Sequence, residues 1–232
     1  MTRQTDLFGR PLLAPEEHAW AHDLQAYRSE YDEHEKNGYI YSPADGVVPR
    51  ISWIMGMLCD LPRGSKILDI GCKTGEMLLP LSTLWRYELY GIDVVQRFVD
   101  ACVARGLNVI QGFAENLPYG DDTFDAVVLC EILEHVLDVG IVMHEALRVL
   151  KPGGMVALSV PFGPWHLGLP PEQRDHHLRE VDLRSFFPYG RDFVAIQMTH
   201  PFTWAPNDIV GTNLMIFRKH TEPPFVRQNV TP

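Results

Sequence analysis

The chain has 232 residues, of which 46% are hydrophobic and 22% are charged. This balance is typical of a folded globular domain and excludes a largely disordered chain, a collagen-like rod and a coiled coil. The formal net charge of −10 makes nucleic acid an unlikely partner, because phosphate groups would be repelled unless a local basic patch attracted them.

The sequence leads us to expect a cytoplasmic protein without membrane insertion. No stretch approaches the ~20 apolar residues that a membrane-spanning helix needs. The N-terminal residues contain only a broken apolar stretch, unlike a secretory signal. The four cysteines stand far apart and form no C-x-x-C pair, so we expect buried thiols in a reducing compartment. They are Cys59, Cys72, Cys102 and Cys130.

The first 65 residues are predicted to form a helical extension. In residues 16–36, apolar and aromatic side chains recur at helical spacing, and the apolar stretch Ile51–Leu61 predicts a second helix. We expect this extension to act as a lid over a substrate site. The predicted divisions of the chain are the extension at 1–65, a core domain at 66–220 and a tail at 221–232.

From Lys66 onward, short apolar runs alternate with helical patterns. Runs that are apolar on both faces are typical of a parallel sheet covered on both sides by helices. Two further runs near the C-terminus have no clear helix between them and predict an antiparallel pair. The predicted fold class is therefore α/β, with a doubly wound, mostly parallel sheet of seven strands. The predicted strands are Ile67–Ile70, Tyr87–Val94, Asn108–Gln111, Ala126–Cys130, Met155–Val160, Phe193–His200 and Asn213–Lys219, with helices after the first strand, at Val95–Arg105 and around Val142–Leu150.

The turn after the first strand is a candidate ligand site. Gly71 and Gly75 permit a sharp turn and a close approach of the backbone to a ligand. Asp93 ends the second strand, where an acid can accept hydrogen bonds from both ribose hydroxyls. The G-x-x-x-G spacing differs from the G-x-G-x-x-G of dinucleotide-binding proteins, and Asp69 would repel a pyrophosphate but could face an ammonium group. A nucleoside that carries an amino acid fits better than a dinucleotide.

Four segments in this order resemble class I S-adenosylmethionine-dependent methyltransferases of the small-molecule type. They are ILDIGCKTG at 67–75, GIDVV at 91–95, the stretch at 112–136 and LKPGG at 150–154. The resemblance implies a Rossmann-like methyltransferase fold and S-adenosylmethionine as cofactor. It implies that the first turn holds the methionine end, the second strand the ribose and the residues after the third strand the adenine. The implied cofactor-binding residues are Asp69, Gly71, Cys72, Gly75, Asp93, Val94, Phe113, Ala114 and Cys130.

The sequence departs from the family pattern at two positions. Lys73 stands where the family commonly has glycine, so the methionine end of the cofactor could be approached differently. Phe113 stands where the family often has an aspartate that contacts the adenine amino group. A backbone contact from Ala114 or stacking by Phe113 could replace that contact, and tolerated drift is the simpler interpretation of both departures.

The residues after the fourth strand are candidates for the chemistry of methyl transfer. In a helical turn, Glu131, Glu134 and His135 would share one face. A histidine titrates near neutral pH, so His135 is a candidate base beside Glu134. The E-x-x-E-H pattern is also similar to that of ubiquinone-pathway O-methyltransferases and small-RNA 3′-end methyltransferases that use a metal, which would make all three residues ligands of Mg²⁺ or Mn²⁺. Alternatively, the glutamate only holds the loop or a cofactor group.

Aromatic and histidine side chains outside the cofactor core are candidates for binding the acceptor, and they are Tyr39, Tyr41, Trp165, His166 and His177. We expect methyl transfer to an oxygen or nitrogen of a small molecule such as a sugar, a phenol or a secondary metabolite, by a monomer or homodimer. One alternative is a metal-assisted methyltransferase that acts on an RNA end or a polyprenyl-type phenol. The other is a non-catalytic subunit that binds S-adenosylmethionine or activates a partner.

Overall fold

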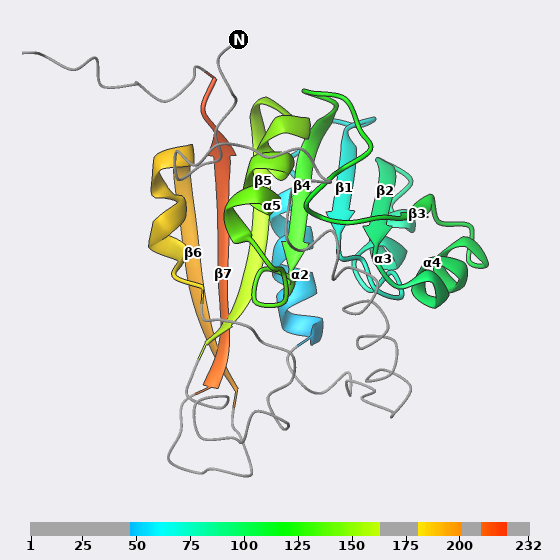
Figure 1. The fold of residues 1–232 in the computed structure, drawn as a ribbon, viewed down its shortest axis with the longest axis horizontal. Coiled ribbons are helices and arrows are strands. Elements are labelled where there is room, and N and C mark those ends of the chain that lie inside the picture. The colour runs from blue at the N-terminus through cyan, green and yellow to red at the C-terminus, as the bar shows by residue number, and fades with distance from the viewer. Residues whose placement is uncertain (1–46, 163–180, 201–209, 222–232) are drawn as a thin grey trace, which may run out of the picture.

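The computed structural model describes residues 47–162, 181–200 and 210–221 (Figure 1). The predicted helix at 16–36 and all of the predicted tail except Thr221 lie outside these residues, so the proposed division of the chain at 1–65 and 221–232 stays a prediction. The helical elements are α2 (Val47–Leu58), α3 (Leu78–Ser82), α4 (Gln96–Val103), α5 (Val139–Val149) and the 3-10 helix η4 (Leu183–Tyr189). The strands are β1 (Lys66–Ile70), β2 (Glu88–Asp93), β3 (Val109–Gln111), β4 (Phe124–Cys130), β5 (Leu150–Phe162), β6 (Gly190–His200) and β7 (Val210–Lys219).

The strands form one seven-stranded sheet in the order β3-β2-β1-β4-β5-β7-β6. The first five strands are parallel, whereas β7 pairs antiparallel with both β5 and β6. In Figure 1 the arrows of β1 and β4 point down and that of β7 points up. The predicted fold class, a mostly parallel α/β sheet with an antiparallel C-terminal pair, is confirmed.

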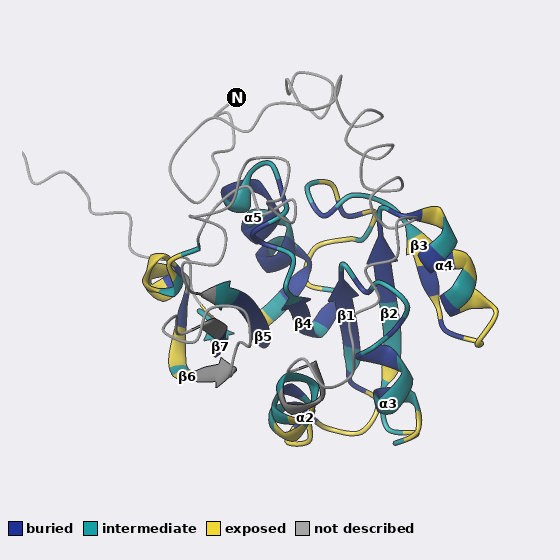
Figure 2. Ribbon diagram, turned by 90° about the horizontal axis from the view of Figure 1, so that it is seen from below, coloured by how far each residue is buried: buried dark blue, intermediate teal, exposed yellow. Residues whose placement is uncertain are grey.

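Helices cover both faces of the sheet, with α2 and α3 on one side and α5 on the other (Figure 2). Side chains of a strand point alternately to the two faces. Accordingly, Leu68 of β1 packs in the core cluster that contains residues of α5, and Ile67 packs in the cluster that contains residues of α2. Each such fully buried side chain contributes about 1.5–3 kcal/mol to folding. The predicted apolar stripe of α4 is also confirmed, because Phe98, Val99 and Cys102 are all buried.

Several boundaries differ from the predictions. Residues 131–138 form turns and not a helical turn, since α5 begins only at Val139. The side chain of Asp138 accepts hydrogen bonds from the N–H groups of Gly140 (2.8 Å) and Ile141 (3.2 Å), which fixes the start of α5. The 3-10 helix η4 had no counterpart in the sequence analysis. Within the described ranges, no helix has both the length and the apolar character needed to cross a membrane.

The strand order determines where a ligand can bind. The chain runs outward from β1 through β2 to β3 and then returns to β4 on the other side of β1. In such sheets ligands bind at the carboxyl ends of the strands, next to the point where the order reverses. The carboxyl ends of β1, β2 and β4 are therefore the place to look for a site.

Candidate functional site

The turn after β1 brings the backbone close to its neighbours. Gly71 and Gly75 have φ angles of 74° and 83°, which glycine adopts without strain. The N–H groups of Gly71 and Cys72 both donate to the carbonyl of Ile92, at 2.8 and 3.2 Å. A Cβ atom at Gly71 would lie only 2.7 Å from Cδ1 of Ile132, in the segment after β4. The turn thus lies directly between the ends of β2 and β4.

Lys73 adopts a conformation that normally favours glycine. Its φ angle is 46°, and its N–H donates a hydrogen bond of 2.8 Å to a carboxylate oxygen of Asp93. The side chain lies over the ring of Phe98, with Nζ 5.9 Å from the ring centroid. Lysine therefore adopts at this position a backbone conformation that glycine reaches without strain.

Asp93 joins the turn to the end of β2. Its side chain is only 8% exposed, so Asp93 is not a surface acid. One oxygen accepts the N–H of Lys73 and the other accepts the N–H of Val95 at 2.9 Å. A carboxylate has about four lone-pair sites, so both oxygens can accept further hydrogen bonds from a ligand.

Asp69 is a buried acid beneath the same turn. It is 2% exposed, and its pKa is raised well above the usual range, first by burial and then by the charges of Asp93 and Glu76. A cation bound nearby would favour the charged form of Asp69, whereas a pyrophosphate would be repelled by this group of acids. The site is therefore suited to a positively charged ligand.

Two thiols border the site without bringing charge to it. Cys72 is buried within the glycine turn, and Cys130 is half-buried at the end of β4. Burial raises the pKa of both thiols. They stay neutral at physiological pH and offer a weakly polar surface.

The segment after β3 lies against the end of β2. The N–H of Gly112 donates to the carbonyl of Asp93 at 3.0 Å, and Phe113 forms an isolated antiparallel bridge with Asn116. Ala114 is buried, while Val94 and Phe113 are half-buried. The structure therefore brings Phe113 and Ala114, the residues implied for adenine, to the same edge of the sheet as Val94 and Asp93.

The residues after β4 carry two buried glutamates. Glu131 has a φ angle of 50°, a strained conformation for this residue type that is typical of functional sites. Its carboxylate lies 3.8 Å from the guanidinium of Arg50 in α2. Glu134 is 1% exposed, and Nε2 of His135 lies 3.7 Å from its Oε1. Burial, and then the charge of Glu131, raise the pKa of Glu134.

Several oxygens in this region have no hydrogen-bond partner within the described part of the chain. They are both carboxylate oxygens of Glu134 and Oε1 of Glu131. Ser159, at the carboxyl end of β5, is a hydrogen-bonding neighbour of Glu131. Buried polar atoms without partners cost free energy and call for an explanation. Here, binding of a polar ligand beside β4 would supply the missing hydrogen bonds.

The predicted metal site is not supported. Across residues 47–162, 181–200 and 210–221, no three His, Cys, Asp or Glu side chains are grouped so as to hold a metal ion. The prediction placed Glu131, Glu134 and His135 on one helical face, but this segment is not helical. The guanidinium of Arg50 also supplies a positive charge beside Glu131, where the prediction required a cation. The donor set does not fit Mg²⁺ or Mn²⁺.

The five residues predicted to contact the acceptor lie outside the described residues, namely Tyr39, Tyr41, Trp165, His166 and His177. Conversely, the sequence analysis missed Arg50 and Ser159. Both contribute to the surroundings of Glu131, but neither belongs to a motif, and Arg50 is distant from Glu131 in the sequence. The only available signal was the position of Ser159 near the end of the fifth predicted strand.

Comparison with known proteins identifies the core of the chain. Residues 68–158, which run from β1 to β5, match a family described as "Methyltransferase domain". This part of the chain is therefore similar to methyltransferase domains. The match includes the glycine turn, Asp93 and the segment after β4, so all the described site residues except Arg50 and Ser159 lie inside it.

Two curated relatives are methyltransferases with very different substrates. The chain is 35% identical over 114 residues to the 27-O-demethylrifamycin SV methyltransferase of Amycolatopsis mediterranei. The aligned stretch covers 46% of this chain and 42% of that protein. It is 31% identical over 134 residues to the tRNA (carboxymethyluridine(34)-5-O)-methyltransferase of Arabidopsis thaliana. Here the aligned stretch covers 53% of this chain and 32% of that protein. The chain thus spans less than half of the length of either relative.

A solved structure agrees with the fold. The SAM-dependent methyltransferase and possible histamine N-methyltransferase of Thermotoga maritima has a TM-score of 0.60 and 20% sequence identity, over 86% of this chain and 99% of that one. At this identity the likeness shows that the two proteins share the Rossmann-like methyltransferase fold. It carries no information on the acceptor.

Proposed function

We propose that the protein transfers the methyl group of S-adenosylmethionine to an oxygen or nitrogen atom of a small molecule. The observation that carries this proposal is the arrangement of acids around the glycine turn. Asp69 is buried beneath the turn, and Asp93 is hydrogen-bonded to it at the end of the next strand. This arrangement suits a nucleoside with a cationic amino-acid group.

The described residues would divide the cofactor among them. The backbone at Gly71 and Gly75 allows close approach of the methionine part of the cofactor. The Asp69 carboxylate would face the ammonium group of this methionine part, and the Cys72 and Cys130 thiols would lie beside its hydrocarbon portion. Asp93 would accept hydrogen bonds from the ribose hydroxyls. The adenine ring would lie against Val94 and Phe113, with its edge toward the backbone of Ala114. All nine of these residues are those that the resemblance implied.

The bound cofactor supplies a methyl group that is electrophilic because its sulfur is a sulfonium. The protein must then orient the acceptor, exclude water and remove a proton where the acceptor carries one. We assign the role of general base, which removes this proton from the acceptor, to His135, whose Nε2 lies 3.7 Å from Oε1 of Glu134. His135 accepts the proton of the acceptor's hydroxyl or amine group, and the resulting imidazolium favours the charged form of the neighbouring Glu134, which in turn stabilises it. The unpaired Oε1 of Glu131 accepts a hydrogen bond from the acceptor.

One observation favours a second candidate, methylation of RNA. The Arabidopsis relative is named for tRNA. Against this candidate stands the formal charge of −10, which would oppose the approach of a polyanion. We therefore favour a small acceptor, such as a phenol or a hydroxylated secondary metabolite.

A radiolabel transfer assay tests the proposal. The full chain is incubated with methyl-tritiated S-adenosylmethionine and, separately, with a panel of phenols and hydroxylated macrocycles or with total tRNA. The proposal expects label in the extracted small molecules and about 100-fold or more slower transfer by His135→Asn, as is usual when a general base is lost. Label found only in tRNA would replace the proposal by the second candidate. Failure of the wild-type chain to bind S-adenosylmethionine in calorimetry would overturn both.

A further inference from the structure

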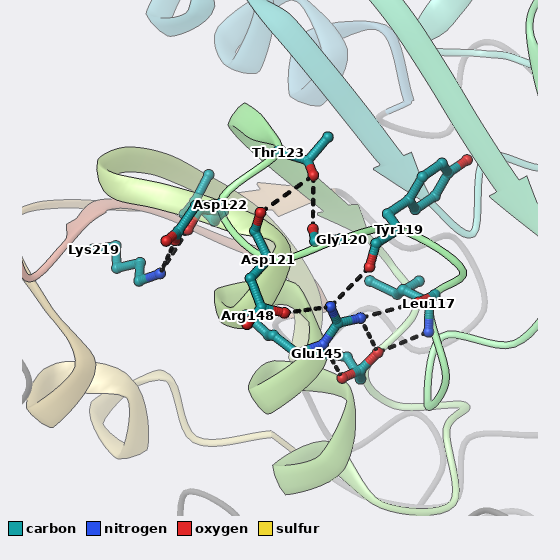
Figure 3. Close-up of polar contacts among 10 residues, drawn as sticks. Leu117, Tyr119, Gly120, Asp121, Asp122, Thr123, Glu145, Arg148 and Lys219 are labelled. Carbon is teal, nitrogen blue, oxygen red and sulfur yellow. Dashed lines mark hydrogen bonds and ion pairs between the residues drawn. The ribbon is translucent and has the colours of Figure 1, made fainter.

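Arg148, in the last turn of α5, binds the segment that follows β3 (Figure 3). Its guanidinium donates to both oxygens of Glu145 (2.6 and 2.7 Å), to Asp121 (2.8 Å) and to the carbonyls of Tyr119 (2.8 Å) and Leu117 (3.0 Å). A guanidinium has five N–H donors, so these contacts use all of them. Such complete use fixes the geometry of the partners strongly.

Glu145 adds a second connection to the same segment. Its Oε2 accepts the backbone N–H of Leu117 at 2.8 Å as well as a bond from Arg148. Leu117 is therefore held through both its N–H and its carbonyl, while its side chain is 3% exposed. Farther along, the N–H groups of Asp122 and Thr123 donate to the carbonyls of Arg148 and Val149. The segment from Leu117 to Thr123 is tied to α5 over its whole length.

The other face of the segment is held by rings. Tyr119 packs edge-on against Phe124, with ring centroids 5.0 Å apart, and against Tyr90 at 6.3 Å. Burial raises the pKa of Tyr119 to about 12, so this ring stays neutral. The segment is thus fixed by hydrogen bonds on the side of α5 and by aromatic contacts on the side of the sheet.

The turn at residues 113–116 lies between two fixed points. On one side, the N–H of Gly112 is bonded to the carbonyl of Asp93, and on the other, Leu117 is bonded to Glu145 and Arg148. Only this short turn, closed by the Phe113–Asn116 bridge, separates the two. A shift of Leu117 would therefore move Ala114 relative to the end of β2.

We propose that Glu145 and Arg148 are positioning residues that hold the 113–116 turn against the nucleobase and thereby set the preference for adenine. This inference rests on the proposed function, because it takes the turn to face the adenine of S-adenosylmethionine. Adenine accepts a hydrogen bond at its N1 edge, whereas hypoxanthine carries a hydrogen there. A backbone N–H held in place by the turn distinguishes the two bases, and a displaced one does not.

The variant Glu145→Gln tests the proposal with a minimal change in size. Glu145 accepts three N–H bonds with two oxygens, but a glutamine amide has a single acceptor oxygen. In either orientation its NH2 group would face a donor, which is Leu117 N–H or Arg148 Nε–H. The matched control is Asp182→Asn, because Asp182 forms a similar two-pronged pair with Arg184 at the start of η4. The helix η4 contacts β6 and β7, which lie at the opposite end of the sheet from β2 and β3. Both variants lose one carboxylate partner of an arginine.

The measurement is the affinity of each folded protein for S-adenosylhomocysteine and S-inosylhomocysteine. We expect Glu145→Gln to bind S-adenosylhomocysteine about 3- to 10-fold more weakly, the loss typical of one hydrogen bond, and to lose most of the preference for the adenine compound. Asp182→Asn should keep both affinities within about twofold. Arg148→Lys, which keeps the charge but not the fork, should behave like Glu145→Gln and replaces it if that variant does not fold.

Two results would overturn the inference while leaving the proposed function intact. One is an unchanged affinity for S-adenosylhomocysteine in Glu145→Gln. The other is an equal loss of affinity for both compounds, which would mean that the network only stabilises the fold. If the wild-type chain binds neither compound, the proposed function fails and the inference fails with it.

Discussion

Replacing Gly71 by alanine should destabilise the protein and weaken cofactor binding, and Gly106 offers a matched control. Both residues have positive φ angles, 74° at Gly71 and 79° at Gly106. An alanine in this left-handed region costs about 1–2 kcal/mol because its Cβ approaches the following carbonyl oxygen. The two variants share this backbone cost.

They differ in the space around the added Cβ. At Gly106 nothing lies within 4 Å, whereas at Gly71 the Cβ would lie 2.7 Å from Cδ1, 3.2 Å from Cγ1 and 3.3 Å from Cβ of Ile132. The Cδ1 atom alone could rotate away, but the Cβ of Ile132 moves only with its backbone. Overpacking of this kind costs about 1–3 kcal/mol. We therefore expect a loss of about 1–2 kcal/mol of unfolding free energy for Gly106→Ala and about 2–5 kcal/mol for Gly71→Ala.

Urea denaturation measures the two stabilities, and calorimetric titration with S-adenosylhomocysteine measures binding. Gly106→Ala should bind as the wild type does. Gly71→Ala should bind at least about tenfold more weakly, since one misplaced backbone contact of 1.4 kcal/mol gives that factor. Equal stabilities of the two variants, together with wild-type affinity in Gly71→Ala, would refute the close approach of the turn to the segment after β4.

Three further predictions concern charge and backbone conformation. Asp69→Asn should stabilise the protein while weakening cofactor binding, because the raised pKa of Asp69 means that the folded state binds more protons than the unfolded state. In thermal unfolding, the gain in stability should grow as pH rises above the ordinary aspartate pKa near 3.9 and vanish below it. A gain in stability that shrinks with rising pH would contradict this. Lys73→Gly should raise the unfolding free energy by up to about 1 kcal/mol, since glycine removes the strain of a φ angle of 46°, and a loss above about 1 kcal/mol in urea denaturation would argue against that strain. Treatment with EDTA should leave the transfer rate within about twofold, because Arg50 already supplies the positive charge beside Glu131, and loss of activity that Mg²⁺ restores would reinstate the metal hypothesis.

The sheet and the placing of the glycine turn beside Asp93 were predictable because each depends on local patterns. Runs apolar on both faces indicate buried parallel strands, and the spacing of Phe98, Val99 and Cys102 indicates one buried helix face. The start of α5 was also within reach, since Asp138 is a typical N-cap residue that was overlooked. A helix that begins there leaves Glu131, Glu134 and His135 outside it, in the turns that the structure shows.

The remaining features depend on contacts that no local pattern encodes. The pairing of Arg50 with Glu131 joins α2 to the end of β4, which are far apart in the sequence. The left-handed conformation of Lys73 follows from its bond to Asp93 on the neighbouring strand and is not a property of lysine. For the same reason the sequence could suggest a ribose-binding role for Asp93, but not that this residue also holds the turn.

Calorimetric titration with S-adenosylhomocysteine of the full chain and of its Asp93→Ala variant is the decisive measurement. Saturable binding by the wild type, weakened by about 1–3 kcal/mol in a variant that circular dichroism shows to be folded, is the predicted result. Absence of binding at millimolar concentration, equal affinity in both proteins, or preferential binding of NAD would contradict a nucleoside site built on Asp93 and the turn after β1.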